Sequence, residues 1–499
     1  MTGQPTARRN WVHRSVLLTA LTLGLLDIWI AVVSLRWPLV GDAAMFHFAV
    51  SQFMLGAVPY KDFIDMNMPL IYVIHAAVIW VGGMGDLAFR IFDLGSSVAI
   101  GLLAGALVRP AGLSNAFLAA VTIIAAHLLF GPQAAGERDF LLLGPAFTAA
   151  LCSVRAAERP SAGFPWLFAA GVAVGLAALL KPTAVILLAL PLTVRPFRVA
   201  NLLVGGAGLC SIALVTLLVM TDLGATEAFI RDFRDYEPFY VGLAHRSWLV
   251  LPAVALKHTG LGVGGLLLAA VFCVRAETSP RLLVLIGLAV FGAIHFMLQG
   301  KGFFYHAYPL IGGVACLSAW SLPKTPVPFT CAALGVSAAV FGTQAVQAFE
   351  YSRFPADLIM PAPVSRTLQD ALKAHVAAGA RVQMLDMSGG AFLAMARSGL
   401  RQATPYAYWL YLAPGKPAWR SEFVKDIQSR PPDAILVTDA TWPSEDGLKA
   451  VDDWPEFSAE LACCYRLIEA QTRTEPSIPW FASSPSVSWR LYVLRGPAG

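Results

Sequence analysis

Long apolar segments recur along the first two thirds of the chain, and they limit its fold more than any other feature. A helix that spans a membrane needs about 20 predominantly apolar residues, and residues 16–35 meet that length. The sequence therefore predicts an α-helical polytopic membrane protein. Further apolar segments lie at residues 69–84, 88–108, 112–130, 140–154, 164–180, 183–194, 199–221, 248–273, 282–298, 307–323 and 327–347.

The composition agrees with a membrane protein and divides the chain in two. Of the 499 residues only 13% are charged, about half of the roughly 25% that is usual in soluble domains. Charges are sparse before residue 348 and ordinary after it, so we expect a transmembrane domain over residues 1–347 and a soluble domain over residues 348–499. The net charge of +5, without a Lys/Arg run, does not indicate nucleic acid. The adjacent Cys463 and Cys464 can pair only in a strained ring, and no disulfide framework is expected.

The charges between the apolar segments predict how the chain crosses the membrane. Arg8 and Arg9 precede the first segment, and the positive-inside rule places this end in the cytoplasm. Basic loops near residues 155–159, 195–198 and 275–281 are expected on the same side.

Only one crossing fits between the outer loop that ends at residue 68 and the basic Arg109, although two apolar segments are available. The segment 69–84 is short and opens with a proline, which is more typical of a segment that dips into the interface. Leaving it out gives about eleven transmembrane helices and one long outer loop over residues 36–87. The C-terminus then lies outside, as in a bacterial inner membrane whose C-terminal domain faces the periplasm.

The region after residue 348 has the pattern of a small extracytoplasmic α/β domain. Residues 362–378 show helical periodicity. Three short apolar runs predict buried strands at 382–387, 434–438 and 489–494. Alternating helix and strand indicate a sheet covered by helices.

Polar side chains gather in the loops that are expected at the outer face. The first of these loops holds Asp42, Asp62 and Asp65, and its amphipathic stretch 43–56 suits a helix on the membrane surface. A catalytic centre needs such a convergence of polar groups. The charged cluster at 231–237 is assigned no role, because it suits a solvated surface helix. Later outer loops add Glu137, Arg138, Asp139, Lys181, Lys301, Tyr305 and His306.

The first outer loop resembles that of the C-type (GT-C) glycosyltransferases. The pair GD at 41–42, followed by GAVPYKDFIDMNMPLIY at 56–72, is similar to the protein O-mannosyltransferase and lipid A aminoarabinose transferase group. The resemblance covers residues 12 to about 320, and it implies a helical membrane domain with an outward C-terminal domain. Acidic, basic and aromatic site residues of that group correspond to GERD at 136–139, Lys181-Pro182 and Tyr305-His306.

The resemblance implies an inverting transfer of a sugar from a polyprenyl-phosphate carrier to a glycan, lipid or protein acceptor. Asp42 would take the proton of the acceptor hydroxyl. Lys301 and His306 would stabilise the leaving phosphate, with Lys181 or Arg138 as alternatives.

Further candidate substrate-binding residues are Tyr60 and Tyr305, which would contact the sugar, together with Asp62, Glu137 and Asp139. Structural roles stay open for several of them. Asp62 could shape a turn, and Glu137 and Asp139 could form a local ion pair with the intervening arginine.

The chain departs from the family pattern at the first acidic position. Many members have two adjacent acidic residues there, whereas Asp42 is followed by Ala43. This leaves one candidate base and weakens the case for a bound divalent metal, which the sequence leaves open. No other cofactor is expected, because the donor is linked to a lipid.

A transporter or flippase of a lipid-linked or small polar substrate is the alternative from another functional class. Transporters place ionisable groups near the bilayer midplane, often in repeated halves. Here nearly all charges lie at the ends of the apolar segments, and Asp27 is an exception inside the first one. A glycan polymerase or ligase is disfavoured by the first-loop motif. The sequence thus favours an interfacial enzyme.

Overall fold

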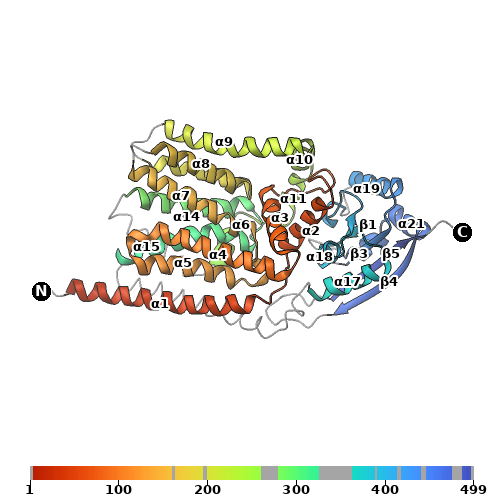
Figure 1. Ribbon diagram of the computed structural model, residues 1–499, viewed down its shortest axis with the longest axis horizontal. Coiled ribbons are helices and arrows are strands. Elements are labelled where there is room, and N and C mark those ends of the chain that lie inside the picture. The colour runs from red at the N-terminus through yellow and green to blue at the C-terminus, as the bar shows by residue number, and fades with distance from the viewer. Residues whose placement is uncertain are drawn as a thin grey trace.

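The computed structural model has two parts, a helical bundle and a smaller part built around a sheet (Figure 1). The N-terminus lies at the far end of the bundle and the C-terminus beyond the sheet (Figure 1). The expected domain boundary near residue 348 lies outside the described residues. The structure describes residues 4–159, 163–194, 199–259, 279–324, 362–387, 390–412, 417–439, 446–474 and 486–495.

The helices of the bundle lie side by side and correspond to the apolar segments of the sequence (Figure 1). Five stretches of the described chain are long and apolar enough to cross a membrane, by length and composition. The first lies within α1 (Gln4–Ser34), and the others contain α4 (Asp86–Val108), α6 with α7 (Arg138–Leu141 and Leu143–Glu158), α9 (Val199–Asp222) and α14 (Pro280–Gln299). Shorter helices are α5 (Leu113–Leu128), α8 (Gly163–Ala178), the 3-10 helix η4 (Pro182–Thr193), α12 (Leu251–Thr259) and α15 (Tyr308–Ser321).

The last apolar segment, residues 327–347, lies outside the described residues, as does most of the segment 248–273. The number of crossings therefore stays a prediction.

The outer surface of the bundle is apolar. Leu25 of α1, Leu102 of α4 and Leu203 of α9 are each 68% exposed. A contiguous apolar surface is costly in water and marks a surface that another apolar phase covers. Together with the helix lengths, this exposure is what a bundle surrounded by lipid requires.

The end of the bundle away from the sheet collects basic side chains. Arg281 forms an ion pair with Glu158 at 2.6 Å and donates a hydrogen bond to the carbonyl oxygen of Leu107 at 3.1 Å. Arg155 lies 3.8 Å from the same carboxylate. Arginines from two loops that the sequence assigns to the cytoplasmic side thus lie at one end, although the compartment that this end faces stays a prediction.

Two short helices, α2 (Asp42–Met54) and α3 (Leu70–Gly82), lie between the bundle and the sheet (Figure 1). With 13 residues, α3 is about 20 Å long, which is shorter than a hydrocarbon core of about 30 Å. The sequence predicts α2 as an amphipathic surface helix, and this expectation is corrected. Nine of its 13 residues are buried, because α18 (Gly390–Arg397) of the C-terminal part packs against it.

The C-terminal part contains a five-stranded mixed sheet with the order β2-β1-β3-β5-β4. Strands β2, β1 and β3 are parallel, whereas β5 pairs antiparallel with β3 and β4. Every residue of β3 is buried, as expected of a parallel strand covered on both faces. The strands are β1 (Arg381–Leu385), β2 (Arg401–Gln402), β3 (Ala434–Thr438), β4 (Tyr465–Thr474) and β5 (Ser486–Leu494). The other helices of this part are α17 (Ala362–His375), α19 (Pro417–Ser429), α20 (Gly447–Asp452) and α21 (Pro455–Cys464).

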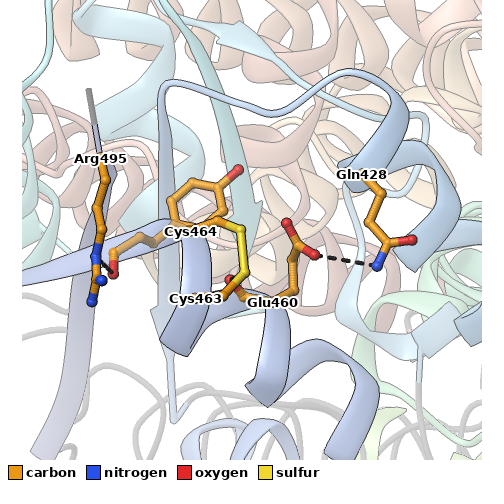
Figure 2. Close-up of a disulfide and its surroundings, with 6 residues drawn as sticks. Gln428, Glu460, Cys463, Cys464 and Arg495 are labelled. Carbon is orange, nitrogen blue, oxygen red and sulfur yellow. Dashed lines mark hydrogen bonds between the residues drawn. A yellow bond between two sulfur atoms is a disulfide. The ribbon is translucent and has the colours of Figure 1, made fainter. Parts of the chain in front are cut away.

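A disulfide joins two adjacent cysteines at the end of α21. Figure 2 shows the bond between Cys463 and Cys464. Glu460, on the same helix, accepts a hydrogen bond from Gln428 at 3.2 Å (Figure 2). The disulfide links neighbours in the chain, so it connects no distant elements and is not a framework for the domain.

Helices α8 and α9 approach each other closely through glycines. A Cβ atom on Gly171 would lie 1.8 Å from the carbonyl oxygen of Gly205, and one on Gly208 would lie 2.2 Å from the carbonyl oxygen of Phe168. Small residues at such positions are typical of packed membrane helices, because they let two backbones meet.

We therefore predict that Gly208→Ala destabilises the protein by about 1–3 kcal/mol, since the added methyl group forces the two helices apart. Gly206→Ala is the matched control on the same helix, because a Cβ atom at Gly206 meets nothing within 4 Å. Thermal unfolding in detergent gives the midpoint of each variant. Equal midpoints for the two variants would contradict the packing described here.

Candidate active site

A cavity of about 410 Å³ lies where the end of the bundle meets the C-terminal part. Its walls come from the start of α2, the turn before α3, the loops after α8 and α14, and the helices α10 (Thr226–Asp235) and α11 (Glu237–Gly242). The C-terminal part adds Met387 and Tyr408. Six of the residues predicted from the sequence line this cavity, namely Asp42, Arg138, Lys181, Lys301, Tyr305 and His306.

Asp42 is placed by the turn between α1 and α2. Gly41 has a φ of +61°, a conformation that glycine adopts without steric cost. Asp42 is the first residue of α2, where the helix dipole favours a negative charge. Its side chain is 30% exposed, and one carboxylate oxygen lies 3.5 Å from Arg138. Asp42 thus offers an accessible carboxylate at the edge of the cavity.

Arg138 begins α6 and holds its guanidinium inside the cavity wall. Besides Asp42, it contacts the side-chain oxygen of Asn67. The guanidinium also lies 5.3 Å from the centre of the Phe46 ring, within the range of a cation–π contact. These contacts fix a buried positive charge next to the candidate base.

Lys181 and Asp139 form the centre of a buried network below the cavity. The Nζ atom of Lys181 lies 3.2 Å from Asp139 and 3.4 Å from the side-chain oxygen of Gln299. His295 donates its Nε2–H to the other oxygen of Asp139 at 2.6 Å, because a carboxylate only accepts. The Nδ1 atom of His295 lies 2.8 Å from the hydroxyl of Thr183. Asp139 therefore pairs with Lys181 and does not line the cavity.

Lys301 extends over an aromatic ring of α11. Its Nζ atom lies 3.1 Å from the centre of the Tyr240 ring. Burial, together with the positive charges of Lys181 and Arg138, lowers the pKa of Lys301 to about 7. The ammonium group is thus poised to gain or lose its proton near neutral pH, and a bound anion would favour the charged form.

Tyr305 and His306 belong to the 3-10 helix η5 (Phe304–Ala307) and pack edge to face, with ring centres 4.7 Å apart. Burial lowers the pKa of His306 well below its usual range. The sequence suggests a cationic role for His306, and the structure favours the neutral imidazole. It can still donate a hydrogen bond to a phosphate oxygen.

Four of the predicted residues do not line the cavity. Tyr60 is buried and donates to the carbonyl oxygen of Asn67 at 2.7 Å. Asp62 is exposed and accepts from the backbone N–H of Val58 at 2.8 Å, which is the turn-forming role that the sequence left open. Glu137 is buried, and burial raises its pKa well above the usual range. The fourth is Asp139, described above.

The cavity also contains polar residues that were not among the predicted site residues. Asp65 belongs to the first-loop motif, and its position two residues before Asn67 was a usable signal. Glu237 ends the charged cluster at 231–237 that was assigned no role, and Tyr240 follows it on α11. Tyr408 carries no local signal, because only the tertiary structure brings it to the cavity.

The donor groups of the cavity do not form an obvious metal cage. Within the described residues, one group of three His, Cys, Asp or Glu side chains lies close enough to share an ion, and it consists of Glu460, Cys463 and Cys464. Disulfide sulfurs are not thiolates, and the thiolate is the ligand form. At the cavity the carboxylates lie beside the basic side chains of Arg138, Lys181 and Lys301.

The fold is similar to those of two solved proteins, ArnT and an archaeal oligosaccharyltransferase. ArnT from Cupriavidus metallidurans in the apo state matches with a TM-score of 0.61 and 13% identity, over 96% of this chain and 99% of that chain. The same protein bound to undecaprenyl phosphate matches with a TM-score of 0.61 and 14% identity, over 94% and 97% of the two chains. The oligosaccharyltransferase of Archaeoglobus fulgidus in the apo form matches with a TM-score of 0.52 and 11% identity, over 97% of this chain and 88% of that chain.

The sequence matches no protein-family model and no curated protein. The likeness to the solved structures is therefore one of fold, and it extends over the bundle and the C-terminal part together.

The network around Lys181 yields a stability prediction. Asp139→Asn leaves a buried ammonium group without its counter-charge, which typically costs about 3–5 kcal/mol. We expect a correspondingly lower midpoint of thermal unfolding in detergent, with part of the loss recovered by the double variant Asp139→Asn/Lys181→Met. Asp222→Asn, at an exposed carboxylate, is the control. An unchanged midpoint in Asp139→Asn would show that the pair does not stabilise the bundle.

Proposed function

We propose that this protein is an integral-membrane glycosyltransferase that moves a sugar from a polyprenyl-phosphate carrier to an acceptor. The observation that carries the proposal is the composition of the cavity, in which Asp42 lies with Arg138, Lys181 and Lys301. One carboxylate and several cations are the groups that transfer from a phosphate leaving group requires. The fold supports the proposal, since ArnT of the same fold has been solved with undecaprenyl phosphate.

The reaction can be written with the residues of this chain. Asp42 takes the proton of the acceptor hydroxyl as its oxygen attacks the anomeric carbon of the sugar. The bond between that carbon and the phosphate oxygen breaks, and its electron pair stays on the phosphate. Arg138, Lys181 and Lys301 oppose the negative charge that develops there. A single displacement of this kind inverts the anomeric configuration.

The location of the cavity suits a lipid-linked donor. It lies at one end of a bundle whose sides are apolar, so the polyprenyl chain could stay in the bilayer while its phosphate reaches the cations. We assign this end to the periplasmic face of a bacterial inner membrane, with a cytoplasmic N-terminus. The acceptor is a glycan, lipid or protein of the cell envelope.

A transporter or flippase is the second candidate, and Asp27 is the observation that favours it. This carboxylate lies within α1, is buried, and has no hydrogen-bond partner among the described residues. Ionisable groups inside membrane helices are often functional. The other charged groups of the cavity lie at the bundle end, however, and not along a path through it.

The first functional prediction concerns the base. Asp42→Asn keeps the size of the side chain but cannot accept the proton, so we expect transfer to fall by about 10²–10⁴-fold. The rate of transfer is measured with purified protein in detergent. The protein is supplied with a radiolabelled polyprenyl-phosphate sugar and envelope extract. Glu227→Gln, at an exposed carboxylate on α10, should behave as the wild type.

Two outcomes would count against the proposal. Retained transfer in Asp42→Asn would remove this residue as the base. Movement of a labelled lipid across a vesicle membrane, without transfer and dependent on Asp27, would favour the transporter instead.

The second functional prediction concerns pH and Lys301. Because its pKa is lowered to about 7, Lys301 is charged below that pH and becomes neutral above it. The KM for the donor should therefore rise as the pH increases through about 7. Lys301→Arg should weaken this dependence, since an arginine stays charged. Initial rates from about pH 6 to pH 9 test this, and identical profiles for the two proteins would exclude Lys301 as the titrating contact.

A further inference from the structure

Asp65 is a buried carboxylate whose hydrogen bonds join the membrane part to the C-terminal part. One oxygen accepts from the hydroxyl of Tyr72 at 2.5 Å and from the hydroxyl of Tyr408 at 2.8 Å. The other accepts from the backbone N–H of Asn67 at 3.0 Å and from its side-chain amide at 2.6 Å. Asp65 itself is 1% exposed. The carboxylate is thus surrounded by hydrogen-bond donors, and one of them, the hydroxyl of Tyr408, belongs to the C-terminal part.

These hydrogen bonds continue to the candidate base. The same oxygen of Asp65 accepts from the backbone N–H and from the side-chain amide of Asn67, so Asp65 fixes which end of the Asn67 amide turns toward it. The NH₂ group of Asn67 points to Asp65, and the amide oxygen is left to accept from Arg138. Arg138 in turn lies 3.5 Å from Asp42. A continuous polar chain therefore runs from Tyr408 to Asp42.

Tyr408 has two separable roles in this arrangement. Its ring packs against Phe63 and Phe392, with centre distances of 5.4 and 5.7 Å. Its hydroxyl contacts Asp65, and the residue also lines the cavity. Replacing tyrosine by phenylalanine removes the hydroxyl and keeps the ring.

We propose that Tyr408 is a positioning residue for sugar transfer, through which the C-terminal part sets the geometry of the base. Its hydroxyl holds Asp65, Asp65 orients the Asn67 amide, and the amide aligns Arg138 beside Asp42. The C-terminal part is then a component of the active site and not only an appended domain. The inference rests on the proposed function, because it concerns the rate of that transfer.

The test separates the hydroxyl from the packing. In the full-length protein, Tyr408→Phe should lower kcat for transfer by about ten- to a hundredfold, as expected for the loss of a hydrogen bond to a charged group. The KM for the donor should change less than kcat, because Lys181 and Lys301 still face the phosphate when the alignment of Arg138 is lost. Thermal unfolding verifies that the variant is folded.

Tyr411→Phe is the matched control. Tyr411 is equally buried and close in sequence, but its hydroxyl has no hydrogen-bond partner within the described part of the chain. Its removal should leave kcat unchanged.

A double-mutant cycle distinguishes a positioning role of Tyr408 from a merely structural one. If Tyr408 acts through Asp65, the losses in Tyr408→Phe and Asp65→Asn should not add in the double variant. Additive losses, or wild-type kcat in Tyr408→Phe, would overturn this inference and leave the proposed function intact. A wild-type protein without transfer activity would instead contradict the proposed function itself.

Discussion

The cost of burying charge beside an apolar bundle determines how this protein is arranged. An ammonium group removed from water is tolerated only where a counter-charge and hydrogen bonds replace its solvent. Asp139 supplies that counter-charge to Lys181, and His295 completes the group from a third segment of the chain. The ends of α8 and α14 and the start of α6 are held together by this network, and the cavity lies directly beside it.

The arrangement of the cavity follows from this constraint. Charges gather at the two ends of the bundle, with Arg281 and Glu158 at one end and Asp42 and Arg138 at the other. The end that carries Asp42 also meets the sheet, so the cavity is closed by both parts of the chain. An interfacial enzyme acting on a lipid-linked donor requires such a site, polar inside and adjacent to the hydrocarbon.

Local signals in the sequence were sufficient for the apolar helices of the bundle, for α17, for three of the strands and for six cavity residues. Asp42, Lys181 and Lys301 could be identified because each interrupts or borders an apolar segment. An ionisable side chain is costly there and is therefore often functional. The burial of α2 could not be predicted, since it depends on α18, more than 300 residues away in the chain. The contact of Tyr408 with Asp65 is hidden for the same reason, because an isolated tyrosine in a soluble segment carries no pattern.

The cations at the bundle end are proposed to bind the phosphate of a polyprenyl carrier. A structure of the protein with undecaprenyl phosphate tests this binding most directly. We expect the phosphate inside the cavity, within hydrogen-bond distance of Arg138, Lys181 or Lys301, and the polyprenyl chain along the apolar side of the bundle. A phosphate bound elsewhere, with the cavity free of lipid at saturating concentration, would contradict it.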